Sequence, residues 1–299
     1  MKRKRIVWIG AALIVIAAIL ANAPGRTGSD DDLDSAQSVP GESAGAATEA
    51  ENTETEAETT ETEPEATDAA QTEATEPELE ILDQSALGDT SAISYLKGRT
   101  ETGAVVEIID GVTYVDGYLL VNKTYSLPAD YVPEGTKAAL DGVQKSNEGL
   151  VLEAWEAWQQ LQAAAAAEGL SIYISSGYRS YSYQGMLWSN YVARDGQAAA
   201  DTYSARAGHS EHQTGYCFDL NSISSAFTNT AEGIWVNENC CRYGFIIRYP
   251  EGKSDQTGYK YESWHLRYVG QELAQTLYNG GDWITMEEYF GLASVYAAD

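Results

Sequence analysis

The decapeptide SEHQTGYCFD, residues 210–219, carries more information about this chain than any other stretch of its sequence. Its first half is polar and ends at Gly215, which is typical of a loop. Its second half is aromatic and apolar, which is typical of a strand. The stretch therefore predicts a loop that leads into a strand. It also contains His212 and Asp219, both of which are residues of metal-binding type.

The chain has only three histidines, and a second one of interest lies in ESWH, residues 262–265, between aromatic, strand-like segments. Zinc in hydrolases typically takes three ligands from His, Asp and Glu and leaves one position for water. His212, Asp219 and His265 would supply that set. Glu262 would remain as a base for the water. Taken singly, each histidine also fits a hydrogen-bonded structural role. Residue types alone therefore do not distinguish a metal site from structural histidines.

Residues 115–292 resemble the VanY-type D-alanyl-D-alanine carboxypeptidases and the related L,D-carboxypeptidases of bacterial cell walls, which belong to the hedgehog-like zinc peptidases. The resemblance rests on short segments that occur in the family's order. They are VNK at 121–123, SGYRS at 176–180, GHSEHQTGYCFD at 208–219, RYP at 248–250 and ESWH at 262–265.

The resemblance implies a role for each matching residue. It implies that His212, Asp219 and His265 bind one Zn²⁺ per domain and that Glu262 is the catalytic base. It further implies a catalytic arginine and three substrate contacts, which are Arg179, Gln184, Ser210 and Tyr249.

The function that the resemblance implies is a zinc metallocarboxypeptidase that removes C-terminal D-alanine from peptidoglycan stem peptides. Two alternatives remain: an L,D-carboxypeptidase acting on tetrapeptide stems, and a cell-wall-binding module without activity. The presence of Glu262 together with all three ligand candidates counts against the inactive module. We expect the protein to be a monomer.

The charge of the chain is unevenly distributed. The formal net charge is −27, and residues 28–80 contain eighteen Asp and Glu but no Lys or Arg. This acidity argues against a nucleic-acid partner, which requires a basic footprint. Residues 24–84 are rich in Thr, Glu and Ala and poor in large apolar residues, so we predict a disordered tether there.

The N-terminal residues 1–23 predict a membrane anchor. A basic quartet, residues 2–5, precedes an apolar run over residues 6–23 that would span about 27 Å as a helix. The basic end should stay cytoplasmic, which places the catalytic domain outside the membrane. Cleavage after Ala23 would instead release the protein, but Pro24 disfavours that cut.

The remaining residues, 85–299, predict one α+β domain, a small antiparallel sheet packed with helices. Helices are expected at 150–168, where Trp155 and Trp158 face the core, and at 181–193, 231–242, 269–278 and 286–292. Strands are expected within 111–121 and at 172–174, 245–249 and 259–268. The three cysteines leave two possibilities open: a disulfide from Cys217 to Cys240 or Cys241, or buried free thiols.

Overall fold

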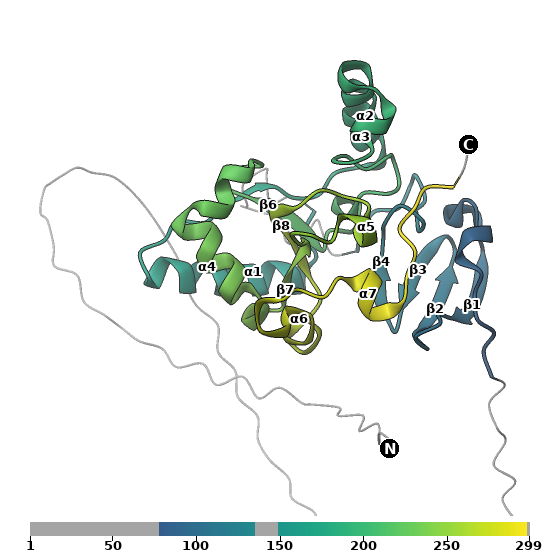
Figure 1. The fold of residues 1–299 in the computed structure, drawn as a ribbon, viewed down its shortest axis with the longest axis horizontal. Coiled ribbons are helices and arrows are strands. Elements are labelled where there is room, and N and C mark those ends of the chain that lie inside the picture. Colours follow the sequence, from purple (N-terminus) through teal and green to yellow (C-terminus); the bar gives the residue numbers. More distant parts are fainter. Residues whose placement is uncertain (1–77, 135–148, 298–299) are drawn as a thin grey trace, which may run out of the picture. The chain divides into compact units, whose positions relative to one another are not determined.

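The computed structural model describes residues 78–134 and 149–297, which belong to one compact unit spanning Thr72–Asp299 (Figure 1). The predicted anchor, residues 1–23, and the predicted tether up to residue 77 lie outside the described residues. The end of the predicted tether, residues 78–84, is instead part of the domain, because the Arg99 N–H donates to the Glu80 carbonyl and the Leu82 N–H donates to the Arg99 carbonyl, both at 2.9 Å. Within the described ranges, no helix is both long enough and apolar enough to cross a bilayer.

The first of two four-stranded sheets is an antiparallel meander in which chain neighbours pair in the order β1-β2-β3-β4. Its strands are β1 (Tyr95–Arg99), β2 (Val105–Ile109), β3 (Val112–Val115) and β4 (Tyr118–Leu120). Asp110-Gly111 joins β2 to β3 and Asp116-Gly117 joins β3 to β4, all four residues having positive φ. Asp-Gly is a favoured pair for such tight hairpins.

The second sheet is also antiparallel, but its strand order is β5-β6-β8-β7. Its strands are β5 (Ile174–Ser176), β6 (Cys217–Leu220), β7 (Phe245–Tyr249) and β8 (Glu262–Tyr268). Strand β8 pairs with both β6 and β7 and so lies in the interior of the sheet. This arrangement brings the two segments singled out in the sequence next to each other.

Helices surround the second sheet and connect its strands (Figure 1). The α-helices are α1 (Leu152–Ala167), α2 (Tyr181–Asp195), α3 (Gln197–Ala200), α4 (Ala231–Asn239), α5 (Ser254–Thr257), α6 (Gln271–Tyr278) and α7 (Met286–Phe290). Short 3₁₀ helices are η1 (Gln84–Ala86), η2 (Thr90–Ala92), η4 (Glu211–Thr214), η5 (Ser225–Asn229), η6 (Cys240–Tyr243) and η7 (Asn279–Gly281).

Part of the main core lies between α1 and the second sheet, and the same core extends to the first sheet. Trp158 is buried, and its ring contacts Phe218 of β6 edge-on at 5.1 Å between centroids. Phe218 in turn contacts Phe245 of β7 at 5.2 Å. The predicted core role of Trp158 is therefore confirmed. Trp155 is partly buried against the same core.

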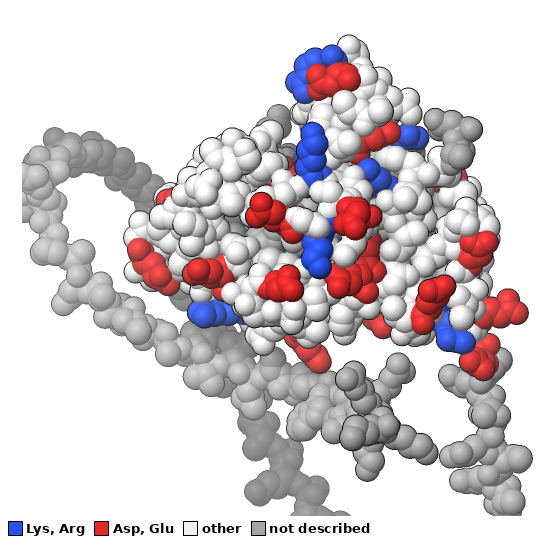
Figure 2. Space-filling view, in the orientation of Figure 1, with Lys and Arg blue, Asp and Glu red and all other residues white. Residues whose placement is uncertain are grey.

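The structure confirms the predicted α+β class, with two differences in detail. The strand expected at 172–174 lies at Ile174–Ser176, and β1 and β2 join β3 and β4 in a second sheet where one sheet was predicted. The three cysteines are buried free thiols, so the predicted alternative without a disulfide is the one observed. On the face in Figure 2, single Lys and Arg side chains are set among acidic and uncharged residues.

Candidate active site

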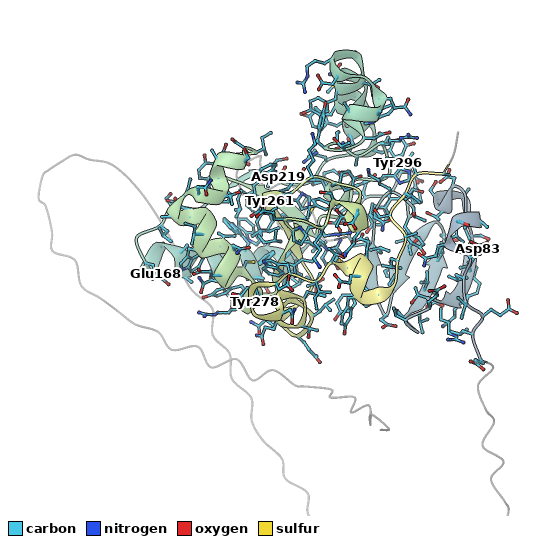
Figure 3. All side chains as sticks on the ribbon, in the orientation of Figure 1. Asp83, Glu168, Asp219, Tyr261, Tyr278 and Tyr296 are labelled. Atoms are coloured by element: carbon cyan, nitrogen blue, oxygen red, sulfur yellow. The ribbon has the colours of Figure 1, made fainter. Side chains whose placement is uncertain are left out.

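One pocket of about 830 Å³ contains every residue that the sequence analysis assigned to the site. Asp219, labelled in Figure 3, comes from the second sheet, and α2 and the loop before η4 supply other walls. The assigned residues that line the pocket are Arg179, Gln184, Ser210, His212, Asp219, Tyr249, Glu262 and His265.

The pairing of β6 with β8 places Asp219 directly opposite His265. Residues opposite each other on neighbouring strands project to the same face of a sheet. The Asp219 Oδ1 atom lies 3.3 Å from His265 Nδ1, and its Oδ2 atom lies 3.4 Å from His212 Nε2. One carboxylate thus stands between two imidazole rings whose centroids are 5.0 Å apart.

His212 has its tautomer set by the backbone. Its Nδ1 atom lies 2.7 Å from the carbonyl oxygen of Gly177 and must donate, because a carbonyl can only accept. The lone pair therefore sits on Nε2, the atom that faces Asp219. Burial, followed by the nearby Arg179 cation, lowers the pKa of His212 to about 4, which keeps the ring neutral. A neutral imidazole is the form that binds metals.

The two carboxylates of the pocket differ in their charge state. Burial by itself would raise the pKa of Asp219, but His212, His265 and Arg179 outweigh burial and hold it well below its usual range. Burial raises the pKa of Glu262 to about 7, and the Asp219 charge adds to this effect while His265 opposes it. Asp219 is thus a permanent anion, whereas Glu262 can take up and release a proton near neutral pH.

Arg179 is held in the pocket by hydrogen bonds from both ends of its guanidinium group. Nη1 donates to Gln184 Oε1 at 3.0 Å, and Gln184 in turn donates to the carbonyl of Ala205 at 2.8 Å. Nη2 donates to Asp219 Oδ2 at 2.9 Å and also contacts His212 Nε2. Among the described residues, Arg179 Nε has no hydrogen-bond acceptor.

The other two assigned residues form parts of the wall. Ser210 is buried and lies immediately before η4. The Tyr249 ring lies 4.9 Å from the His265 ring and 4.9 Å from the Tyr259 ring, measured between centroids. Burial raises the pKa of Tyr249 well above its usual range, so its hydroxyl remains protonated.

The donors of this pocket fit a zinc ion. His212 Nε2, Asp219 and His265 Nδ1 are nitrogen and oxygen atoms of the kinds that zinc binds in catalytic sites. Arg179 Nη2 contacts two of these three residues, His212 and Asp219. In this structure the guanidinium therefore supplies the positive charge that a zinc ion would supply to the same atoms. The other nitrogen of each imidazole is also engaged, as is usual for metal-binding histidines.

Cys217 is a further potential donor close to the same residues. Two overlapping groups have ligand atoms within 4.8 Å of one another: Asp219, Glu262 and His265, and His212, Cys217 and His265. Burial raises the pKa of the Cys217 thiol, and a protonated thiol is a poor ligand. The ionised Asp219 is therefore the stronger candidate.

Sequence reasoning missed a set of buried charged residues next to the ligand candidates. Glu211 accepts hydrogen bonds from Arg248 and Arg267, and its other oxygen faces His265. Burial alone would raise the pKa of Glu211, but the two arginines hold it well below its usual range. A signal was present in the sequence, because Arg248 interrupts the otherwise apolar and aromatic strand FIIRY.

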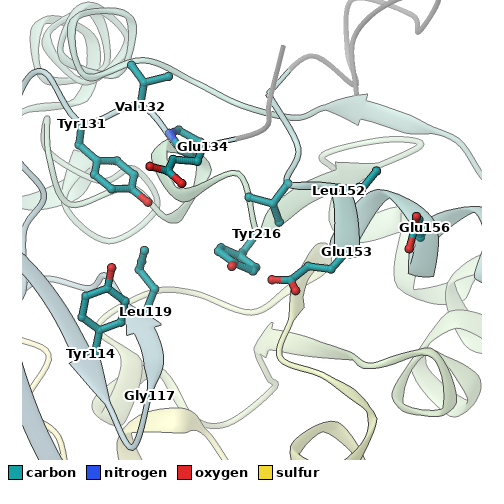
Figure 4. Close-up of a pocket in the computed structure, with 12 residues that line it drawn as sticks. Tyr114, Gly117, Leu119, Tyr131, Val132, Glu134, Leu152, Glu153, Glu156 and Tyr216 are labelled. Atoms are coloured by element: carbon teal, nitrogen blue, oxygen red, sulfur yellow. The ribbon is translucent and has the colours of Figure 1, made fainter. Parts of the chain in front are cut away.

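A second pocket of about 680 Å³ lies apart from the assigned residues (Figure 4). The β3–β4 hairpin, residues 131–134 and the start of α1 form its walls. Tyr114, Tyr131 and Tyr216 line it together with Glu134 and Glu153. Tyr216 immediately precedes the buried strand β6 in the chain.

Comparisons with known proteins agree with this geometry. The family model described as VanY, D-alanyl-D-alanine carboxypeptidase, matches residues 147–271. A putative carboxypeptidase of Bacillus subtilis, YodJ, is 41% identical over 183 residues, covering 57% of this chain and 66% of the relative. The bifunctional D-Ala-D-Ala dipeptidase and carboxypeptidase VanXYC of Enterococcus gallinarum is 32% identical, covering 57% of this chain and 91% of the relative.

Two solved structures are similar in fold as well as in sequence. The LdcB LD-carboxypeptidase is 38% identical, with a TM-score of 0.52, covering 59% of this chain and 85% of that one. The L,D-carboxypeptidase DacB from Streptococcus pneumoniae is 34% identical, with a TM-score of 0.50, covering 69% and 96%.

The α+β fold with this pocket defines the hedgehog-like fold class. The chain belongs to the VanY family of D-alanyl-D-alanine carboxypeptidases. The matches span 66% of the length of the Bacillus subtilis relative and 57% of that of a D-alanyl-D-alanine carboxypeptidase from Enterococcus faecium.

Proposed function

We propose that the protein is a zinc-dependent carboxypeptidase that removes the C-terminal D-alanine from peptidoglycan stem peptides. The observation that carries this proposal is the cross-strand pair of Asp219 and His265, with His212 and Glu262 beside it in one pocket. Membership of a family named for D-alanyl-D-alanine carboxypeptidases supports the class of substrate.

The proposed mechanism divides the work between zinc and Glu262. His212, Asp219 and His265 would hold the zinc, which would polarise the scissile carbonyl and lower the pKa of the water that attacks it. Glu262 accepts a proton from the attacking water as the new C–O bond forms. It then passes the proton to the leaving amine as the C–N bond breaks. A pKa of about 7 suits a group that must both accept and release a proton.

Arg179 is proposed to bind the negative charge of the substrate. Its guanidinium is a fixed cation, oriented by Gln184, that can grip a terminal carboxylate or stabilise the developing oxyanion. Ser210, Gln184 and Tyr249 are proposed to contact the peptide from the walls of the pocket.

The role of Arg179 is tested by pairing a variant with a substrate change. If Arg179 grips the terminal carboxylate, Arg179→Ala should lower kcat/KM by roughly 10- to 100-fold, the value of a hydrogen bond to a charged group. Wild-type protein should then cleave C-terminally amidated peptides poorly. Arg194→Ala is the matched control, because Arg194 lines the same pocket but is exposed and paired with Asp195. Equal cleavage of amidated and free peptides would assign Arg179 to the oxyanion instead.

An L,D-carboxypeptidase activity on tetrapeptide stems is the second candidate. A specific observation favours it: the two solved structures with TM-scores of 0.52 and 0.50 are both L,D-carboxypeptidases. The two activities are separated by incubating the full-length protein with defined muropeptides and weighing the products by mass spectrometry. Loss of one alanine from pentapeptides supports D,D cleavage, and loss from tetrapeptides alone supports L,D cleavage. Absence of both products from zinc-loaded protein would contradict the enzyme proposal.

We also propose that residues 1–23 anchor the protein in the cell membrane as a single span, with the residues from 24 to 77 as a tether and the monomeric domain outside. The basic quartet followed by an apolar run supports this topology. Fractionation of native cells tests it. Full-length protein should appear in the membrane pellet, and a form beginning near residue 24 in the medium would contradict anchoring.

A further inference from the structure

Next to the ligand candidates, two carboxylates and two guanidinium groups form a buried network. Glu211 and Glu287 supply the carboxylates, and Arg248 and Arg267 supply the guanidinium groups. None of the four side chains is more than 2% exposed. Their formal charges cancel, which matters because an unpaired charge at such depth would be strongly destabilising.

Glu211 uses its two oxygens for different partners. Oε1 accepts from Arg248 Nε at 2.7 Å and from Arg267 Nη1 at 3.1 Å. Oε2 lies 3.3 Å from His265 Nε2. Both arginines therefore bind one oxygen, and the other remains directed at the imidazole.

This division determines the tautomer of His265. A carboxylate paired with two arginines can only accept hydrogen bonds, so His265 Nε2 must carry a proton. The lone pair of the neutral ring then sits on Nδ1, which lies 3.3 Å from Asp219 and 3.8 Å from Glu262. Nδ1 is thus the nitrogen that the neutral ring would offer to a metal ion in the pocket.

We propose that Glu211 is a positioning residue that fixes His265 as an Nδ1 ligand of the metal, an inference that rests on the proposed zinc site. Glu211 immediately precedes the ligand candidate His212 in η4. The same short turn therefore supplies one ligand and the group that orients another. The arginines act by holding the Glu211 carboxylate in place.

Glu287 of α7 belongs to the same network but does not touch a ligand candidate. It binds Arg248 at two points, 2.8 and 2.7 Å, and accepts from Asn122 at 3.0 Å. Glu287→Gln and Glu211→Gln each remove one buried negative charge from one network. Only the second variant alters the group facing His265, so the pair separates positioning from general stability.

The consequence of Glu211→Gln follows from hydrogen-bond geometry. A glutamine has one acceptor oxygen, and both arginines require it at the Oε1 position. The amide NH₂ then faces His265 Nε2, which must accept, and the ring proton moves to Nδ1. That proton occupies the atom that zinc needs, so the variant should bind zinc weakly.

The experiment measures zinc affinity of the full-length protein by competition with a chromogenic chelator, alongside the melting temperature of the metal-free form. We expect the zinc dissociation constant to rise roughly 10- to 100-fold in Glu211→Gln but less than about threefold in Glu287→Gln. Both variants should melt at lower temperature. Equal weakening of zinc binding in the two variants would overturn the proposal.

A second measurement needs no variant at all. Nitrogen-15 histidine labelling followed by NMR of zinc-loaded wild-type protein reports three side chains only, because the chain has three histidines. We expect His265 to carry its proton on Nε2 and zinc on Nδ1, and the reverse arrangement would overturn the proposal even if Glu211→Gln fails to fold. Neither measurement uses a peptide substrate, so loss of the proposed carboxypeptidase function would appear separately.

Discussion

The two four-stranded sheets differ in whether their charged side chains are exposed or buried. In the first sheet, Lys97 and Glu107 face each other across β1 and β2 with 40% and 31% of their side chains exposed. In the second sheet, Arg248 and Arg267 are almost completely buried and pair with Glu211. Both sheets bury apolar residues, but only the second also buries ionised ones.

The difference determines in which sheet the loss of one charged side chain should cost most stability. Removing one partner from a buried ion pair typically costs about 3–5 kcal/mol, whereas an exposed pair contributes about 0.2–1 kcal/mol. The first sheet can therefore lose a charge with little effect, since water replaces the partner. The second sheet cannot, because the same residues orient the groups of the active site.

The largest expected effect comes from removing a ligand candidate on the second sheet. His265→Ala should reduce bound zinc from one ion per chain to near zero and abolish turnover, because two ligands remain in place of three. Elemental analysis of protein prepared without chelators measures this.

His209→Ala is the matched control for that variant. His209 lies outside the ligand set, and its Nδ1 atom is hydrogen-bonded to the carbonyl of Asn122. Its removal should leave one zinc per chain. A His265→Ala protein that still holds one zinc would refute the ligand assignment.

Glu262 lies at the other end of the same ESWH segment, and Glu262→Gln should impair catalysis without impairing metal binding. The variant removes the base but no ligand, so zinc content should stay at one ion. The turnover number should fall by roughly 10²- to 10⁴-fold, the usual contribution of a positioned acid–base group. Steady-state kinetics on a D-Ala-D-Ala peptide, with zinc content measured in parallel, tests this. Wild-type turnover in this variant would rule out Glu262 as the base.

A core substitution in the first sheet should change stability alone. Ile108 of β2 is fully buried, and Ile108→Ala should lower the free energy of unfolding by about 2–5 kcal/mol. Zinc affinity and kcat/KM at 25 °C should be unchanged, because Ile108 does not line the active-site pocket. Denaturant unfolding and kinetics on the same sample compare the two. A large loss of zinc affinity in folded variant would show that the two sheets are coupled.

The smallest effect should come from the exposed ion pair of the first sheet. Lys97→Met should change the free energy of unfolding by less than about 1 kcal/mol, since both charges remain largely hydrated. The remaining difference should shrink in 1 M salt, where the screening length falls to about 3 Å. A salt-independent loss of several kcal/mol would mean that the two sheets do not differ as described.

Much of the fold could be predicted because its signals are local. The helix expected at 150–168 is α1 at Leu152–Ala167, and the strand expected at 245–249 is β7 at Phe245–Tyr249. Strand β2 was missed although its apolar run Val105–Ile109 is followed by the Asp110-Gly111 turn. Strand β1, with Lys97, Gly98 and Arg99 in five residues, has too weak a pattern to stand out.

The sequence by itself determined the chemistry available to this protein. Only three histidines occur in the chain, and two of them stand in short segments with carboxylates nearby, so the donor types and their order could be read directly. The tertiary structure alone decided that Asp219 faces His265 and that Glu211 turns its second oxygen to the same ring. Strand register and charge burial depend on contacts between residues far apart in the chain, and no local pattern encodes those contacts.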